Sequence, residues 1–218
     1  LVGEIGAWMD EPFSDPSLVP TYLLSRFTRK HVTVALGGDG GNEKFTGYPM
    51  YAGHQWAAIY ERVPRFLRTG ILEPLIRSLP VKTKNLSFDY KAMKFVTGVK
   101  YDTVARHHIW FGSFTPEEQQ QLLTRDAIAE TDDDIYRQAR EMMSECGQQD
   151  LVKSMQNLDT RLYLAEDILT KVDRASMAVS LEVRAPFLDH RVAEFAASLP
   201  SSYKLRRHKT KYILKKAV

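Results

Sequence analysis

Cysteine is nearly absent from this sequence: Cys146 is the single one in 218 residues. A lone cysteine cannot form a disulfide within the chain, which fits a protein of a reducing compartment. The chain also lacks any apolar run that approaches the roughly 20 residues needed to span a bilayer. Its N-terminal stretch holds Glu4 and Asp10 but no basic residue, so it does not have the pattern of a signal peptide. These absences predict a cytoplasmic, globular protein without a membrane partner.

Charge of one sign is not in excess either. The 30 Lys and Arg residues nearly balance the 27 Asp and Glu residues, for a net charge of +3, which gives no indication of a nucleic-acid partner. With 44% hydrophobic and 11% aromatic residues, the chain can bury a core, which excludes a disordered or fibrous protein. No internal repeat, low-complexity tract or Gly/Ser-rich linker is present, so no domain boundary is expected within the chain.

The apolar pattern predicts one clear strand and many helices. Residues 31–36 are mostly β-branched or apolar and end at a pair of glycines, which is typical of a short buried strand. Thr115 opens a capping box with Pro116 at the first helical position. Further helices are expected at 15–30, 51–62, 66–79 (as one or two short helices), 88–100, 134–146, 150–177 (interrupted near Asp159) and 189–199.

The first of these helices has a recognisable start. Asp15 is its expected cap, followed by Pro16 at the first helical position. Leu18, Leu23 and Phe27 are then available for a buried face.

A single parallel strand cannot satisfy its own backbone groups and needs paired strands beside it. The chain begins at Leu1 rather than Met, and it ends within an uncapped amphipathic run at 211–218, which is expected to be helical. We therefore expect a mainly α fragment of an α/β domain, with helices around the end of a parallel sheet whose other strands lie upstream.

The strand leads directly into residues 37–43 (GGDGGNE), with four glycines in five positions. Glycines there let a ligand approach the backbone closely, and the carboxyl end of a parallel strand is where open α/β sheets bind nucleotides. An acid in such a loop serves to bind an amine or a metal ion. A tight turn without a ligand is the alternative, although a plain turn requires fewer glycines. The loop is neither a Walker motif nor a GxGxxG fingerprint.

Residues 164–189 combine charged and apolar side chains. Glu182, Arg184 and Asp189 flank the apolar residues 185–188. We favour an ion-pair network that braces helices around a buried turn over direct chemistry, with Asp189 as the cap of the next helix.

The basic tail at 203–216 contains seven Lys or Arg residues and no acid. It could be a solvated helix face, a nucleic-acid patch, or a site where one lysine meets a phosphate or a developing oxyanion. The small net charge argues against the nucleic-acid interpretation.

Three other polar groups carry no predicted chemistry. His107 and His108 are adjacent and point to different faces of a helix, which makes them a poor metal pair. The acids at 132–134 are expected to cap the next helix. Cys146 has no basic activator nearby in the sequence and is expected to be inert.

Four stretches of the chain resemble one known family, in that family's order. They are residues 10–22 (DEPFSDPSLVPTY), 32–48 (VTVALGGDGGNEKFTGY), 164–189 (LAEDILTKVDRASMAVSLEVRAPFLD) and 199–217 (LPSSYKLRRHKTKYILKKA). The chain is similar to the C-terminal part, over 1–218, of the synthetase domain of glutamine-dependent asparagine synthetases. The middle of the chain, about 62–150, matches in helical character more than in motif.

The resemblance implies an adenine-nucleotide α-hydrolase-like fold and an ATP- and Mg²⁺-dependent ligase. Such an enzyme adenylates the side-chain carboxylate of aspartate, releases pyrophosphate, and lets ammonia from glutamine attack the acyl-adenylate. It implies an N-terminal glutaminase domain of the same polypeptide as a partner and allows a homodimer. The glutaminase cysteine and the SGGxDS pyrophosphate loop of the family would both lie upstream of Leu1, so the isolated fragment is expected to be inactive.

The resemblance also assigns roles within the chain. Asp39, Glu43 and Lys209 are implied as catalytic residues. The ATP-binding residues implied are Gly37, Gly38, Asp39 and Gly40, and the position implied to face a metal is Asn42.

The glycine loop departs from the family pattern SGDGGDE. Gly37 replaces its serine and Asn42 its second acid, while Lys44 and Thr46 replace an expected Leu and Gly. These changes motivate an alternative from another class, in which the protein is a degenerate, non-catalytic homologue acting as a binding or scaffold module.

Overall fold

A computed structural model describes residues 2–7, 9–80, 82, 87–130, 134–146 and 150–218. The chain divides into two compact units, although its sequence predicts no domain boundary. The first unit combines Leu1–Tyr48 with Gln148–Val218, and the second is Pro49–Gly147. Neither junction is rich in glycine or serine, so composition alone gives no sign of the division.

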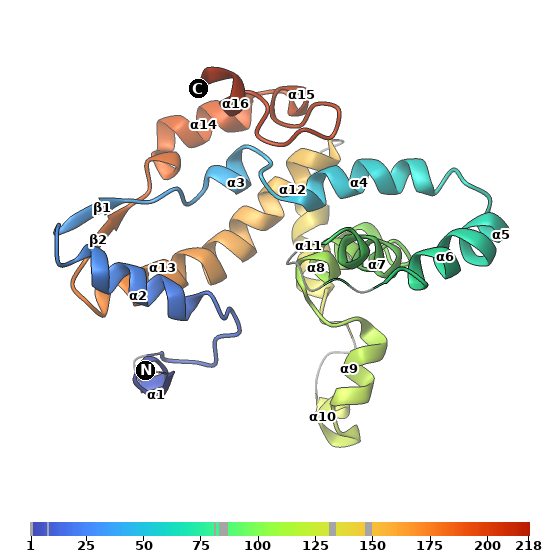
Figure 1. The fold of residues 1–218 in the computed structure, drawn as a ribbon, viewed down its shortest axis with the longest axis horizontal. Helices are drawn as coiled ribbons and strands as arrows, with labels where there is room; N and C mark the ends of the chain where they lie inside the picture. The colour runs from blue at the N-terminus through green and yellow to red at the C-terminus, as the bar shows by residue number, and fades with distance from the viewer. Residues whose placement is uncertain (1, 8, 81, 83–86, 131–133, 147–149) are drawn as a thin grey trace. The chain divides into compact units, whose positions relative to one another are not determined.

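The first unit holds the two strands of the described chain. Its elements are α1 (Val2–Ala7), α2 (Leu18–Thr28), β1 (Val34–Leu36), α3 (Gly41–Lys44), α12 (Leu151–Asp159), the π-helix η2 (Thr160–Leu169), α13 (Thr170–Met177), β2 (Glu182–Arg184), the 3₁₀ turn η3 (Pro186–Leu188), α14 (His190–Ser198), α15 (Ser201–Lys204) and α16 (Leu214–Ala217). In Figure 1, α12, η2 and α13 run on as one helix, and α13 lies beside α2.

β1 and β2 form a parallel two-stranded sheet in which Val34, Ala35 and Leu36 face Glu182, Val183 and Arg184. The mainly helical character with a parallel sheet agrees with the expected fold class. The expected strand at 31–36 is shorter in the structure, because the amides of His31 and Val32 turn back to Thr28 O at the end of α2. The prediction that it is buried is wrong among the described residues, since Leu36 is 75% exposed.

β2 is not predicted by the sequence, in which the charged Glu182 and Arg184 favour an ion-pair network. Both side chains are exposed, and Arg184 Nε donates to Glu182 Oε1 at 2.7 Å. Their backbones pair with β1 instead of bracing helices. The following apolar turn was expected to be buried, but no residue of η3 is buried. Asp189 does cap α14, as predicted, by accepting from the Arg191 amide at 3.0 Å.

The core of the first unit joins segments from both of its chain portions. Ile5, Leu18 and Ala175 are buried together. Leu18 was correctly placed on the buried face of α2, but the same prediction was wrong for Leu23 and Phe27, which are 39% and 59% exposed. The helix also begins later than expected, at Leu18: Asp15 accepts from the Ser17 amide through its side chain and from the Leu18 amide through its carbonyl, which forms a turn ahead of α2.

The second unit is entirely helical within its described residues. Its elements are α4 (Pro49–Tyr60), α5 (Arg65–Leu67), the π-helix η1 (Arg68–Leu72), α6 (Glu73–Arg77), α7 (Phe88–Gly98), α8 (Thr103–Phe111), α9 (Pro116–Leu122), α10 (Arg125–Glu130) and α11 (Arg137–Glu145). The capping box at Thr115 is present as predicted. The interruption expected near Asp159 is wrong, since η2 carries the helix through that place. At 66–79, where one or two short helices were expected, η1 likewise joins α5 to α6.

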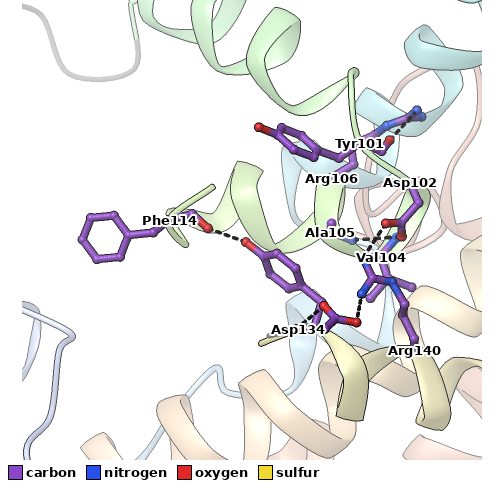
Figure 2. A network of polar contacts seen from close by, with 9 residues as sticks. Tyr101, Asp102, Val104, Ala105, Arg106, Phe114, Asp134 and Arg140 are labelled. Atoms are coloured by element: carbon purple, nitrogen blue, oxygen red, sulfur yellow. Dashed lines mark hydrogen bonds and ion pairs between the residues drawn. The ribbon is translucent and has the colours of Figure 1, made fainter. Parts of the chain in front are cut away.

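A polar network ties α8 to α11 in this unit (Figure 2). Arg140 forms ion pairs with Asp102, at 2.6 Å, and with Asp134. Asp102 also caps α8, accepting from the amides of Val104 and Ala105 at 3.0 and 3.3 Å. Burial raises the pKa of Asp102, but the hydrogen bonds from Arg140 and the amides outweigh burial and hold it below its usual value.

The predicted cap at 132–134 lies outside the described residues except for Asp134, which accepts from the Tyr136 amide at 3.0 Å. Of the two adjacent histidines, His107 belongs to the core of the second unit and His108 is half-buried. His107 is fully buried, and its Nδ1 lies 3.0 Å from His54 Nε2, with the two rings stacked.

No helix of the described residues has the length and apolar character needed to cross a membrane.

Candidate functional site

A cleft of about 600 Å³ opens in the first unit beside the carboxyl end of β1. Its walls come from α2, β1 and β2, the glycine loop, and the junction of η2 with α13. Most of the residues expected at a site lie on this cleft. They are Gly37, Gly38, Asp39, Gly40, Asn42 and Glu43.

The loop itself has a defined shape. The Gly37 amide continues the sheet by donating to Arg184 O at 2.8 Å. Gly40 has a φ of +83°, a left-handed conformation, and it precedes α3 as its N-cap. A Cβ on Gly40 would overlap Leu188 Cδ2, so both the backbone and the close packing require glycine. At Gly38 a Cβ would meet no atom within 4 Å, so the backbone is open there.

The side chain of Asp39 lies close to Gly37. Residue 37 is one of the positions where the sequence departs from the family pattern. A Cβ on residue 37 would lie 2.7 Å from Asp39 Oδ2. That separation is shorter than side chains tolerate, so any larger residue at 37 would displace the carboxylate. The observed position of the Asp39 carboxylate therefore requires glycine at residue 37.

Glu43 is almost fully buried, at 1% exposure, yet its side chain borders the cleft. Tyr48 Oη donates a hydrogen bond to Glu43 Oε1. Burial first, and then the Glu43 carboxylate, raise the pKa of Tyr48 well above its ordinary value. The phenol therefore stays protonated and holds the carboxylate as a permanent donor.

Sequence reasoning missed a buried cation on the same cleft. Lys171, of α13, is 8% exposed, and its Nζ lies 2.5 Å from Asp15 Oδ2. Burial raises the pKa of Asp15, but the hydrogen bonds from Lys171 and Ser17 outweigh it and lower the pKa. Burial, helped by the Asp15 charge, raises the pKa of Asp167 nearby. Asp15 and Lys171 are 156 positions apart, so no local pattern could have joined them.

The predicted catalytic lysine is not on this cleft. Lys209 pairs its backbone with Arg206 and borders a separate hollow of about 350 Å³, together with Tyr212, Lys215 and Lys216. Lys211 was expected to belong to the terminal helix, but that helix begins only at Leu214.

Lys211 instead has a φ of +51°, and its amide donates to Phe45 O at 3.2 Å. Its Cε would lie 2.5 Å from a Cβ on Gly47. Of the two lysines, the structure therefore brings Lys211 to the segment that follows the glycine loop.

The described residues contain no group of three or more His, Cys, Asp or Glu side chains that could hold a metal ion. Asn42 borders the cleft, as does Asp39. Its carboxamide is neutral, so this position supplies no charge to a cation.

The glycine loop at the end of a parallel strand, with two acids on an adjoining cleft, is typical of a nucleotide-dependent enzyme. The family model for asparagine synthase matches residues 2–218, and the chain belongs to the asparagine synthase family.

Two relatives illustrate the similarity. A protein named putative asparagine synthetase [glutamine-hydrolyzing] from Mycobacterium tuberculosis is 33% identical over 99% of this chain and 31% of its own length. Asparagine synthetase [glutamine-hydrolyzing] 1 from Bacillus subtilis is 30% identical over 95% of this chain and 31% of its own length. The chain thus spans about a third of the length of these relatives. No solved structure matches the chain.

Proposed function

We propose that this chain is part of a cytoplasmic ligase that uses ATP to turn a carboxylate into an amide, with ammonia derived from glutamine. The proposed acceptor is the side chain of aspartate. The observation that carries the proposal is the family match over 2–218 together with Asp39 and Glu43 on one cleft beside the glycine loop. The proposed fold of the whole domain is adenine-nucleotide α-hydrolase-like.

The residues fit a nucleotide. Ligand sites typically measure about 300–1,000 Å³, and the cleft, at about 600 Å³, falls within that range. Glycines at 37, 38 and 40 leave the backbone accessible along the loop. We propose that Gly37, Gly38, Asp39 and Gly40 contact the nucleotide there. ATP supplies the activation: a carboxylate oxygen attacks its α-phosphorus and pyrophosphate leaves.

Asp39 is the proposed base of the second step. Ammonia forms a bond to the activated carbonyl carbon, AMP leaves, and a proton passes from nitrogen to the Asp39 carboxylate. Support comes from its place on the cleft, half-buried above Gly37. Glu43 is the second proposed acid, held in one orientation by Tyr48.

A cation is also expected beside the activated carbonyl, where negative charge develops. We propose that the basic tail supplies it. The resemblance points to Lys209, whereas the contacts with Phe45 and Gly47 point to Lys211.

For Mg²⁺ the fit is incomplete. Asn42 is the position proposed to face a metal-bound pyrophosphate, but it is neutral and no acidic cluster among the described residues completes a site. We therefore assign no step of the reaction to an ion bound by this chain.

The relatives are about three times as long as this chain. We propose that the additional length of the full protein includes a glutaminase domain. The test uses the full-length protein with ATP, glutamine and aspartate. We expect asparagine, AMP and pyrophosphate in equal amounts, and we expect free ammonia to replace glutamine. Glutamine hydrolysis without any ATP consumption would contradict the proposal and favour a non-catalytic homologue.

A further inference from the structure

A buried lysine is joined to the end of α3 through one intervening side chain and does not border the cleft. Lys204, at the end of α15, is 2% exposed, and its Nζ donates to Gln156 Oε1 at 2.9 Å. Gln156, of α12, is itself 7% exposed. Its Nε2 donates to Glu43 O at 2.7 Å and to Lys44 O at 2.8 Å. The carboxamide of Gln156 thus joins a buried ammonium to the last two residues of α3.

The orientation of the Gln156 carboxamide is fixed from both ends. The ammonium has only donors, so it requires the oxygen of the carboxamide, and the carbonyls of α3 require its nitrogen. Each of the two amide hydrogens has an acceptor, so turning the group around would leave all three bonds unmade. A hydrogen bond from a charged group also polarises the next one in a series, which strengthens the donors that face α3.

Burying this lysine is unfavourable in itself. Burial, followed by the charge of Lys153, lowers the pKa of Lys204 to about 8. An apolar side chain of similar volume would avoid that penalty if packing were the only requirement. The hydrogen bond from Lys204 Nζ to Gln156 Oε1 offsets part of that penalty.

The segment that this donor holds is α3, which is short and borders the cleft. α3 has only four residues and follows Gly40 directly. The carbonyls of Glu43 and Lys44 have no following helical turn whose amides could donate to them. The Gln156 carboxamide donates to both instead. Glu43 is thereby held at its backbone by Gln156 and at its carboxylate by Tyr48.

We propose that Lys204 is a positioning residue which, through Gln156, fixes α3 and so sets the placement of Glu43 and of the Asp39 loop. Its effect on catalysis rests on the proposed function, but its effect on the loop does not. Neither Lys204 nor Gln156 borders the cleft, so both act through α3.

The experiment compares three variants of the full-length protein. Lys204→Met removes the ammonium while keeping the length of the side chain. Gln156→Glu keeps the shape and can form an ion pair with Lys204, but its carboxylate cannot donate to the α3 carbonyls. Ser201→Ala is the control, because it removes a different side-chain contact of α15, the half-buried 2.6 Å bond from Ser201 Oγ to Asp150 Oδ2.

The first readout is hydrogen exchange at the Lys44 and Gly47 amides, which donate to Gly40 O and Asn42 O. Losing a buried hydrogen bond to a charged group should accelerate their exchange by about tenfold or more. We expect this in Lys204→Met and Gln156→Glu, measured well below the midpoint of thermal unfolding of each variant, and not in Ser201→Ala. Unchanged exchange in either Lys204→Met or Gln156→Glu overturns the proposal, whatever the enzyme catalyses.

The second readout is the kinetics of amide formation. We expect kcat to fall by about tenfold or more in both Lys204→Met and Gln156→Glu, while the rate of glutamine hydrolysis stays within about twofold. A fall in glutamine hydrolysis in parallel, or a normal kcat in folded Gln156→Glu, overturns the positioning role. If the wild-type protein forms no amide, the proposed function fails. Hydrogen exchange alone then decides whether Lys204 positions α3 through Gln156.

Discussion

The side chain of Lys211 packs closely against Gly47: a Cβ added at residue 47 would lie 2.5 Å from the Cε atom of the lysine. The amide of Lys211 donates to Phe45 O, so backbone and side chain both tie the basic tail to the segment after α3. Lys209 lies only two residues earlier but borders a separate hollow. The two lysines can therefore be told apart by experiment.

The first prediction concerns these lysines in the full-length enzyme. A donor preorganised for developing charge contributes about 10²–10³ in turnover. We expect Lys211→Met to reduce pyrophosphate release by that factor while glutamine hydrolysis continues. Lys216→Met, at the exposed end of the tail, is the control and should be nearly silent. If Lys209→Met causes the larger loss instead, the assignment from the resemblance is correct. Equal losses in all three variants would mean that the tail is a general basic surface.

Asp39→Asn tests the proposed base. The change preserves size and removes the proton acceptor, so ammonia-dependent amide formation should fall by about a hundredfold. ATP–pyrophosphate exchange should persist, because activation of the carboxylate precedes the step that needs the base. Product is measured with ammonia in place of glutamine, which removes the glutaminase from the assay. Amide formation at a near-normal rate would show that Asp39 is only a turn residue.

Gly40→Ala tests the geometry of the loop. Alanine at a φ of +83° is strained, and its Cβ would overlap Leu188. Such strain costs about 1–3 kcal/mol, which should lower the free energy of unfolding in urea. Gly38→Ala is the matched control, because a Cβ there meets open space. Equal stability of the two variants would contradict the close packing of Leu188 on the loop.

Part of this site could be read from the sequence. The loop at 37–43 was identified because its glycines follow directly on an apolar strand, and Asp189 was identified because caps are local signals. β2 was missed because three residues with two exposed charges have no apolar pattern.

The remaining misses have a common physical cause. Lys171 with Asp15, and Lys204 with Gln156, are partners 156 and 48 positions apart. Only the packing of helices brings them together, and nothing local in the sequence signals it. Leu23 and Phe27 were placed in the core because helical spacing marks an apolar face without showing what covers it.

His54 should make the second unit sensitive to acid. Burial first, and then the neighbouring His107, lower the pKa of His54 to about 2, from 6.5 in an unfolded chain. Between these values the unfolded state binds more protons, so the free energy of unfolding rises with pH. The contribution is complete above pH 6.5 and is lost progressively below it.

Lowering the pH from 7.5 to 5 should cost about 2 kcal/mol from this group alone. The measurement is urea unfolding of wild type and His54→Gln at both pH values, followed by tryptophan fluorescence. We expect the glutamine variant to lose less stability on acidification. His190→Gln, at an exposed histidine, should behave as wild type. Identical pH dependence of wild type and His54→Gln would contradict a neutral, buried His54.

The last prediction concerns the sheet edge of the isolated 218-residue chain. Among the described residues β1 pairs with β2 alone, so the other edge of β1 presents unpaired backbone groups. Leu36 at that strand is 75% exposed and Val34 is 39% exposed. An apolar edge of this kind is a template for pairing with another chain. We therefore expect the isolated chain to self-associate as its concentration rises in sedimentation velocity experiments, and Leu36→Lys to reduce this association. Leu75→Lys is the control, because Leu75 is also exposed, at 61%, but lies on the helix α6. A chain that stays monomeric, unfolds cooperatively and binds ATP at micromolar concentration would contradict the prediction, as would equal relief of association by Leu75→Lys.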